Sequence, residues 1–154
     1  MIIELPDEAA TAAFAARVAA LARPGDVIAL AGELGAGKTS FARAFIRARG
    51  GADDVPSPTF TLVQVYELDG AAIWHFDAYR LRHPDEAWEL GIEDAFRDGI
   101  SLIEWPDRFG ALVPARRLEI TLSHGTAPAA RRATIDAGPD WGARLGRLVA
   151  GDVR

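Results

Sequence analysis

A phosphate-binding loop signature is the sequence feature that most constrains this chain. Residues 32–39 read G-E-L-G-A-G-K-T and fit G-x-x-x-x-G-K-[ST] at every fixed position. A short apolar run at residues 27–31 precedes the loop, and apolar residues at helical spacing follow it to about Arg49. An apolar strand of this kind is typical of a sheet buried on both faces. The signature therefore predicts a strand, a phosphate loop and a helix inside a layered α/β domain.

Each fixed position of this loop has a physical role in binding phosphate. Gly32, Gly35 and Gly37 let the backbone wrap tightly, so that successive N–H groups point at phosphate oxygens. The following helix adds its positive N-terminal end. Lys38 reaches the β- and γ-phosphates, and the Thr39 hydroxyl suits Mg²⁺. We expect the loop residues that bind the nucleotide to be Glu33, Leu34, Gly35, Ala36, Gly37, Lys38, Thr39 and Ser40.

Lys38 is the only lysine of the chain, since the other 16 of the 17 lysines and arginines are arginine. A guanine-reading Asn/Thr-Lys-x-Asp motif needs a second lysine, and a protein kinase needs a separate strand lysine. Both are excluded by this count. ATP is therefore the expected nucleotide.

The remaining sequence alternates between predicted strands and helices. Beyond the loop unit we predict helices at residues 7–22, with Asp7 as N-cap, and at 84–90, 92–97 and 141–150. Predicted strands cover residues 61–68, 72–76, 101–105, 117–123 and 133–136, with a hairpin turn at Asp69-Gly70. The expectation is one domain over residues 1–154. Its fold class is α/β, a P-loop NTPase-like three-layer sandwich with a mostly parallel central sheet and helices on both faces.

Composition excludes several classes of protein. With 49% hydrophobic and 25% charged residues, the chain is expected to form a globular domain. It has no cysteine, which excludes disulfides, thiolate metal sites and cysteine nucleophiles. The net charge of -5 argues against broad, sequence-independent binding to nucleic acid. No apolar run approaches the ~18 residues of a membrane span, and the N-terminus lacks a signal-peptide pattern, so we expect a cytoplasmic protein.

Two acidic residues end apolar strands, Asp77 after residues 73–76 and Glu104 within residues 101–105. In a parallel sheet these strand ends would lie beside the phosphate loop. Phosphoryl transfer needs a carboxylate near the metal and a group that orients the attacking water. We therefore expect Lys38, Asp77 and Glu104 to be catalytic. The alternative is that each acid only caps the turn or helix that follows.

Several other polar and aromatic residues allow more than one interpretation. Residues 57–61, S-P-T-F-T, form either an ordinary turn or a first switch whose hydroxyls sense the γ-phosphate. His75 is expected to be a strand histidine that faces a sheet surface. Trp105 stacks on the base or a partner, or fills the core. Six arginines are expected to lie on solvated edges of the fold, although some of them alternatively contact RNA or an acidic partner. They are Arg80, Arg82, Arg116, Arg117, Arg131 and Arg132.

Five segments together resemble a known family. They occur in this order: G-E-L-G-A-G-K-T at 32–39, S-P-T-F-T-L-V at 57–63, H-F-D-A-Y-R-L at 75–81, L-G-I-E-D-A-F at 90–96 and I-E-W-P at 103–106. Over about residues 5–137 the chain is similar to the TsaE (YjeE) family, the small ATPases of bacterial tRNA threonylcarbamoyladenosine biosynthesis. The segments after the phosphate loop make the resemblance specific.

The resemblance implies roles for individual residues. Lys38 and Thr39 would bind the phosphates of ATP and Mg²⁺, and Glu104 would be the second metal-coordinating residue. Asp77 would lie by the γ-phosphate and be required for hydrolysis. Thr59 would belong to the switch loop and contact the nucleotide.

The resemblance also implies partners. The protein would act with TsaB and TsaD, where TsaD performs the transfer and ATP hydrolysis permits turnover, with weak activity in isolation. Apart from the resemblance, the net charge of -5 leads us to expect only indirect contact with tRNA. Two alternatives are a small-metabolite kinase and a non-catalytic nucleotide sensor. The short, hydrophobic segment between Asp77 and Glu104 suits docking better than the mobile lid of a kinase, and the presence of both acids weighs against a sensor.

Overall fold

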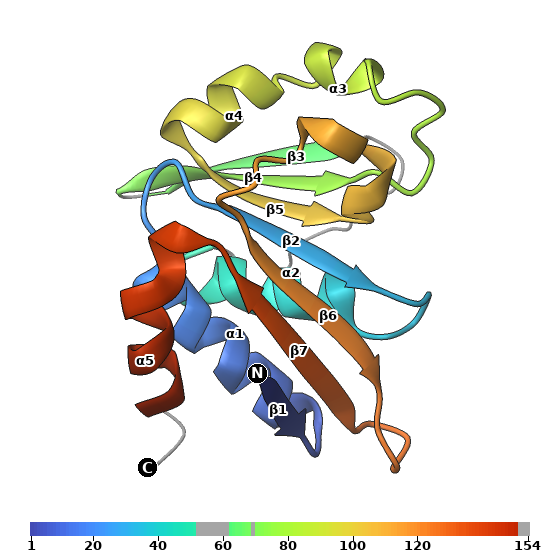
Figure 1. The fold of residues 1–154 in the computed structure, drawn as a ribbon, viewed down its shortest axis with the longest axis vertical. Coiled ribbons are helices and arrows are strands. Elements are labelled where there is room, and N and C mark those ends of the chain that lie inside the picture. The colour runs from blue at the N-terminus through green and yellow to red at the C-terminus, as the bar shows by residue number, and fades with distance from the viewer. Residues whose placement is uncertain (52–61, 69, 151–154) are drawn as a thin grey trace.

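Seven strands form a single sheet that runs through the middle of the molecule (Figure 1). This computed structural model describes residues 1–51, 62–68 and 70–150. The strand order is β1-β7-β6-β2-β5-β4-β3. The bounds are β1 Ile2–Leu5, β2 Val27–Gly32, β3 Val63–Leu68, β4 Ala71–Asp77, β5 Ile100–Glu104, β6 Leu118–His124 and β7 Arg131–Ala137.

Helices cover both faces of this sheet, as predicted. One face carries α1 (Glu8–Leu21), α2 (Lys38–Ala48) and α5 (Gly142–Ala150). The other carries α3 (Glu86–Glu89) and α4 (Ile92–Asp98), together with short 3₁₀ turns after β5 (Figure 1). The three layers of the predicted sandwich are therefore present.

The sheet is mixed, and the prediction of a mostly parallel sheet is wrong. β2 pairs in parallel with β5 and β6, and β4 with β5, but β1–β7, β6–β7 and β3–β4 are antiparallel. Short connections join β6 to β7 and β3 to β4, and a short connection can link neighbouring strands only when they are antiparallel. Strand β1 was not predicted; its four residues lie at the edge of the sheet against β7.

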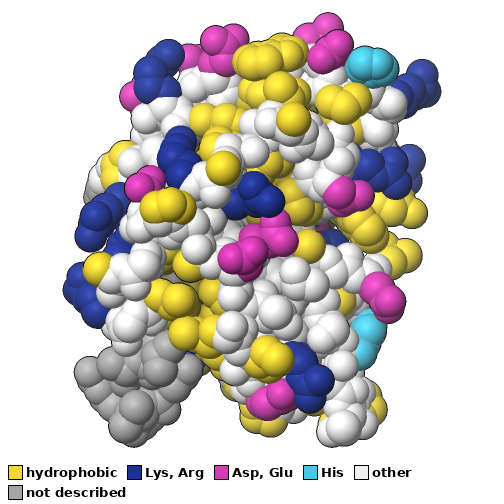
Figure 2. All heavy atoms as spheres, in the orientation of Figure 1, with side chains coloured by type: hydrophobic (Ala, Val, Ile, Leu, Met, Phe, Trp, Pro, Cys, Tyr) yellow, Lys and Arg dark blue, Asp and Glu magenta, His cyan; other side chains and the backbone are white. Residues whose placement is uncertain are grey.

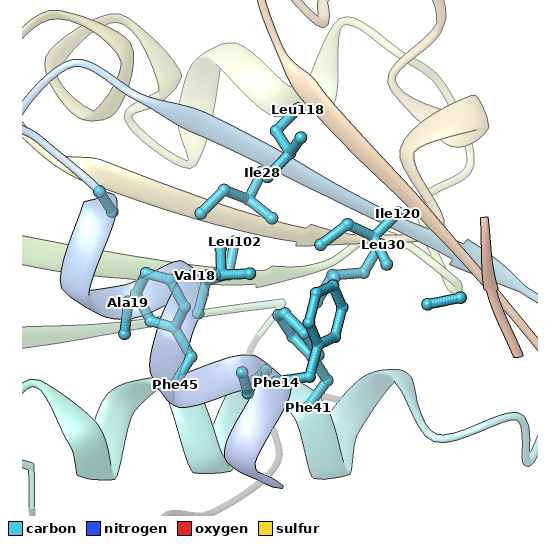
Figure 3. Close-up of a cluster of buried hydrophobic side chains, with 14 of the residues drawn as sticks. Phe14, Val18, Ala19, Ile28, Leu30, Phe41, Phe45, Leu102, Leu118 and Ile120 are labelled. Carbon is cyan, nitrogen blue, oxygen red and sulfur yellow. The ribbon is translucent and has the colours of Figure 1, made fainter. Parts of the chain in front are cut away.

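Helices α1 and α2 are fixed to the sheet by one apolar cluster. The ring of Phe14 on α1 meets that of Phe41 on α2 edge to face, with centroids 5.7 Å apart. Each such buried side chain contributes roughly 1.5–3 kcal/mol. In Figure 3 the helix side chains point toward strand residues Ile28, Leu30, Leu102, Leu118 and Ile120. This packing holds α2 directly against β2, so the loop that joins them has both ends fixed.

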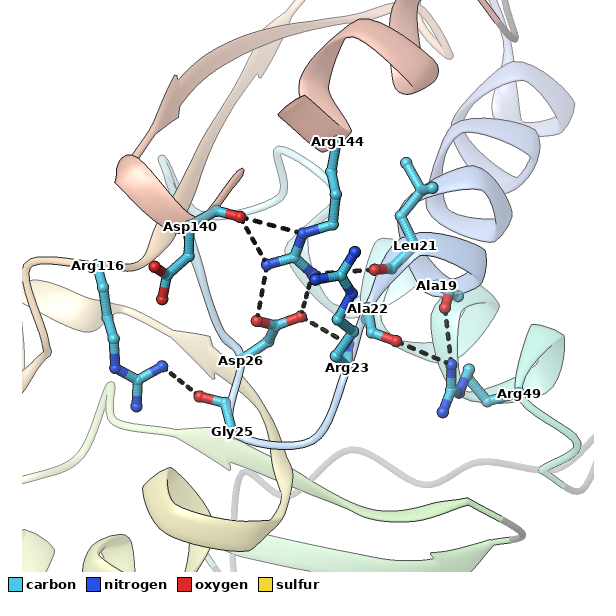
Figure 4. A network of polar contacts seen from close by, with 10 residues as sticks. All are labelled: Ala19, Leu21, Ala22, Arg23, Gly25, Asp26, Arg49, Arg116, Asp140 and Arg144. Atoms are coloured by element: carbon cyan, nitrogen blue, oxygen red, sulfur yellow. Dashed lines mark hydrogen bonds and ion pairs between the residues drawn. The ribbon is translucent and has the colours of Figure 1, made fainter. Parts of the chain in front are cut away.

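The C-terminal helix is attached by a buried ion pair (Figure 4). Arg144 donates to both carboxylate oxygens of Asp26, at 2.6 and 3.0 Å, and to the carbonyl of Leu21 at 3.0 Å. Its guanidinium lies 3.9 Å from the ring centroid of Trp141. Asp26 is the residue before β2, so α5 braces the turn that leads into the strand preceding the phosphate loop.

The face shown in Figure 2 has acidic and basic side chains interspersed rather than gathered by sign. Such a face offers no continuous basic track for a nucleic-acid backbone. Within residues 1–51, 62–68 and 70–150, every helix is too short or too polar to cross a lipid bilayer.

Candidate functional site

The connection between β2 and α2 has the conformation that its glycines predicted. Gly32, Gly35 and Gly37 have φ angles of 135°, 80° and 106°, in the region that side chains with a Cβ rarely adopt. A Cβ on Gly32 would also lie 2.3 Å from the carbonyl oxygen of Leu122 on β6. Glycine is therefore required at this position both by conformation and by the close approach of the neighbouring strand.

Lys38 is the first residue of α2, and its side chain turns back into the loop. Nζ donates hydrogen bonds to the carbonyl oxygens of Gly32 (2.7 Å) and Glu33 (2.8 Å), and lies 4.1 Å from the ring centroid of Trp105. An ammonium group has three N–H donors, so these two bonds leave one for another acceptor. The side chain is thus anchored at the position where the motif needs a cation.

Burial lowers the pKa of the Lys38 ammonium from its ordinary value of 10.5, although the charges of Glu104, Asp77 and Asp107 act in the opposite direction. Removing an ammonium from water disfavours its charged form. A phosphate beside Nζ would favour the charged form again. Lys38 Nζ therefore lies where a neighbouring anion would stabilise its charge.

The two predicted acids lie side by side at the carboxyl ends of β4 and β5. Asp77 is the register partner of Glu104, and both side chains are buried. Glu104 Oε1 accepts a 2.7 Å hydrogen bond from Thr39 Oγ1, which joins the strand acid to the phosphate loop. Asp77 Oδ1 accepts from the backbone N–H of Tyr79 at 3.0 Å, so the capping role expected as an alternative is also present.

A cleft of about 410 Å³ brings most of the predicted residues together. Glu33 and Ala36 do not line it: Glu33 contributes its carbonyl to Lys38, and the Ala36 side chain is buried. Thr59 and the rest of residues 57–61 lie outside the described residues. The predicted residues that line the cleft are Leu34, Gly35, Gly37, Lys38, Thr39, Ser40, Asp77, Glu104 and Trp105.

Trp105 leaves the strand in a left-handed conformation, with φ of 59°, and is half-buried. Its ring lies against Lys38 Nζ on one side and 4.9 Å from the ring centroid of Tyr79. Two aromatic rings therefore cover the Lys38 end of the cleft. Stacking of Trp105 on a nucleotide base stays a prediction.

Arg131, at the start of β7, is a site residue that the sequence analysis missed. Its Nε donates to the carbonyl of Ala36 (3.0 Å) and its Nη2 to that of Gly35 (3.3 Å), so it braces the phosphate loop from outside. The expectation of a merely solvated edge is wrong for Arg131. Its neighbour Arg132 fits that expectation, in an exposed ion pair with Glu4. Only the placement of β7 beside the loop distinguishes the two arginines.

His75 also has a contact that its strand position did not predict. The side chain is fully buried, and Nε2 lies 2.6 Å from Glu104 Oε2. The histidine therefore touches the carboxylate that Thr39 touches from the other side.

A second cleft of about 360 Å³ adjoins the first on the side of α1. The two clefts share Gly37, Ser40 and Arg131. The second is also lined by alanines of α1 and by Arg43 and Arg47 of α2. An elongated molecule bound at the loop has room in both.

Comparison with known proteins identifies relatives for the chain. The family model described as "Threonylcarbamoyl adenosine biosynthesis protein TsaE" matches residues 5–133. A protein of Rickettsia bellii (strain RML369-C) is 40% identical over 119 residues, covering 77% of this chain and 83% of its own length. A protein of Bacillus subtilis (strain 168) is 40% identical over 118 residues, covering 76% and 72%. Both are named tRNA threonylcarbamoyladenosine biosynthesis protein TsaE.

The fold has a solved counterpart as well. The crystal structure of YdiB from Bacillus subtilis superposes with a TM-score of 0.80 at 30% sequence identity. The superposition covers 99% of this chain and 95% of the other. The mixed seven-stranded sheet and its helices therefore follow an architecture already observed by crystallography.

Proposed function

Since the chain belongs to the TsaE family of threonylcarbamoyl adenosine biosynthesis proteins, we propose that it binds ATP with Mg²⁺ and hydrolyses it in the threonylcarbamoyladenosine modification of tRNA. One observation carries this proposal. The hydroxyl of Thr39, in the phosphate loop, donates to the buried carboxylate of Glu104 on a neighbouring strand. A phosphate loop coupled in this way to a strand acid has the parts of a Mg·nucleotide site.

The phosphates of ATP would lie along the loop between the two clefts. The N-terminus of α2, the loop N–H groups and the remaining N–H of Lys38 would bind their oxygens. The adenosine would extend into the second cleft, between the alanines of α1 and the arginines Arg43 and Arg47. Trp105 lines only the first cleft, so stacking of Trp105 on the base is not part of this proposal. Arg131 lines both clefts and would lie close to the phosphates.

Mg²⁺ prefers hard oxygen ligands and keeps several waters, and the site has donors of that kind. Thr39 Oγ1 would ligate the ion through a lone pair while its O–H continues to donate to Glu104 Oε1. Glu104 would bind the ion directly or through one of its waters. When bound, the ion would neutralise charge that develops on the phosphates. Phosphate oxygens and water would complete the shell, since the described residues hold no cluster of three or more acidic or histidine ligands.

Asp77 would orient the attacking water. Glu104 is tied to the phosphate loop through Thr39, whereas Asp77 lines the same cleft from the adjacent strand β4. The Tyr79 N–H fixes the direction of the Asp77 carboxylate. This assignment leaves one acid for the metal and one for the water.

The segment between β4 and β5 supports an ATPase rather than a small-metabolite kinase. Ala87, Ile92 and Ala95 of this segment are buried in the apolar cluster on the face of the sheet opposite α1 and α2. A kinase lid has to open and close over an acceptor. A segment whose side chains are buried in the core is held in place on the sheet, so it is not suited to act as a moving lid.

We further propose that TsaB and TsaD are the partners and that tRNA is contacted only indirectly. The rim of the cleft exposes Leu34 (74%) and Tyr79 (40%), apolar groups that a docking protein would cover. The net charge of -5 supports recruitment through proteins rather than direct binding along an RNA backbone.

Phosphate release from ATP with Mg²⁺ tests the proposal, measured alone and with TsaB plus TsaD. We expect slow release alone, stimulation by the partners, and loss of both in Lys38→Ala. Transfer of phosphate to a small molecule would instead support a kinase. Tight ATP binding without turnover under every condition would support a sensor and contradict the proposal.

A further inference from the structure

His75 stands out because the proposed chemistry does not use it although it contacts the proposed metal site. It lies on β4, two residues before Asp77, and Glu104 lies on the adjacent strand β5. The side chain of His75 is fully buried, and Glu104 is only 2% exposed. The 2.6 Å contact between Nε2 and Oε2 is thus a hydrogen bond shielded from water.

We assign the hydrogen of this bond to the histidine, in the tautomer in which Nε2 donates to Oε2 of Glu104. Oε1 accepts from Thr39 Oγ1 at 2.7 Å. The two donors hold opposite oxygens of one carboxylate, which fixes both the rotation of the group and the oxygen that faces the phosphate loop.

The other ring nitrogen of His75 indicates that the residue is not there for packing alone. Nδ1 is buried and, within the part of the chain that the structure describes, has no hydrogen-bond partner. A buried polar atom without a partner costs about 1–3 kcal/mol. An apolar side chain of similar volume would fill the space without that cost, but would leave Oε2 of Glu104 without its donor.

We propose that His75 is a positioning residue for the metal site: through Nε2 it orients the Glu104 carboxylate so that Thr39 and Glu104 together receive Mg²⁺. This inference rests on the proposed function, since it concerns the same site. His75 lines neither cleft, so it would act only through Glu104. Groups that orient metal ligands in this way typically change metal affinity about 10–100-fold when they are removed.

Binding of a fluorescent ADP analogue, with Mg²⁺ and with EDTA, tests the proposal without using hydrolysis. Three variants separate the possibilities. His75→Gln places an amide N–H as many bonds from Cα as Nε2, whereas His75→Asn reaches only as far as Nδ1 and His75→Leu has no donor. The readout is the ratio of ADP affinity with Mg²⁺ to affinity with EDTA, together with Mn²⁺ titration of the ADP complex.

We expect His75→Asn and His75→Leu to lower this ratio about 10–100-fold, with affinity in EDTA within about 2-fold of the wild type, and His75→Gln to restore most of the ratio. An unchanged ratio in all variants would overturn the proposal. So would an equal loss with Mg²⁺ and with EDTA, or failure of Gln to outperform Asn, because each indicates a structural role. If His75→Leu does not fold, the Gln and Asn pair decides. If the wild-type protein bound ADP with the same affinity in Mg²⁺ and in EDTA, the result would refute the Mg·nucleotide site of the proposed function itself, and not only the role of His75.

Discussion

The brace that Arg131 forms on the phosphate loop gives a quantitative prediction. In Arg131→Gln, the carbonyls of Ala36 and Gly35 lose their guanidinium donors. Two hydrogen bonds at about 0.5–1.5 kcal/mol each amount to about 1–3 kcal/mol of stability for the ordered loop. Because nucleotide binding requires that loop conformation, the same free energy should weaken ADP binding about 5–150-fold, at tenfold per 1.4 kcal/mol.

Titration with the fluorescent ADP analogue measures this loss, and the chain offers a matched control one residue away. Arg132 forms a single exposed ion pair with Glu4, at 2.8 Å, of the kind worth about 0–1 kcal/mol. We expect Arg132→Gln to bind ADP within about 2-fold of the wild type. Arg131→Lys keeps the positive charge but loses the paired N–H donors of the guanidinium, so its affinity for ADP should lie between those of the wild type and Arg131→Gln. Equal affinities for the Arg131→Gln and Arg132→Gln variants would refute the reasoning.

Three further predictions follow from other contacts. Gly32→Ala should destabilise the fold by about 3 kcal/mol or more in urea unfolding, since its Cβ would meet the Leu122 carbonyl; a wild-type midpoint would contradict this. Arg144→Met should cost about 3–5 kcal/mol, roughly 10 °C in Tm, by leaving Asp26 buried and unpaired; an unchanged Tm would count against it. Burial lowers the pKa of Lys38 in the folded protein, so between that lowered pKa and 10.5 the unfolded chain binds more protons than the folded one. The free energy of unfolding of the ligand-free protein, measured in urea, should therefore rise with pH across that range. The same rise should be absent in Lys38→Met.

Local sequence patterns were sufficient for the parts of the fold that local physics decides. Asp7 caps α1 as predicted, accepting from the N–H of Ala10 at 2.8 Å. The strand–loop–helix unit follows from the glycine spacing and the apolar run before it. The short edge strand β1 was missed because its four residues are held by pairing with β7, about 130 residues away, and not by a pattern of their own.

The residues of the candidate site also fall into those that local sequence predicts and those that only the tertiary structure reveals. Lys38 and Thr39 were predicted from the loop motif, and Asp77 and Glu104 were predicted because each ends a strand that the sequence indicates. The structure adds that all four line one cleft. Arg131 was not predicted, because one guanidinium on a strand end looks like another until the neighbouring loop is in place.

By itself, the sequence determined which backbone must coil into the tight loop of residues 32–39, since glycine readily adopts the positive φ angles found there, and which single ammonium enters that loop. Tertiary structure alone decided which side chains hold that loop and its acid. His75 and Glu104 meet because β4 and β5 pair in parallel, and Arg131 meets Ala36 because β7 begins beside the loop. Hydrogen bonds act over about 3 Å, so partners distant in sequence are chosen by strand order and register, which no local pattern encodes.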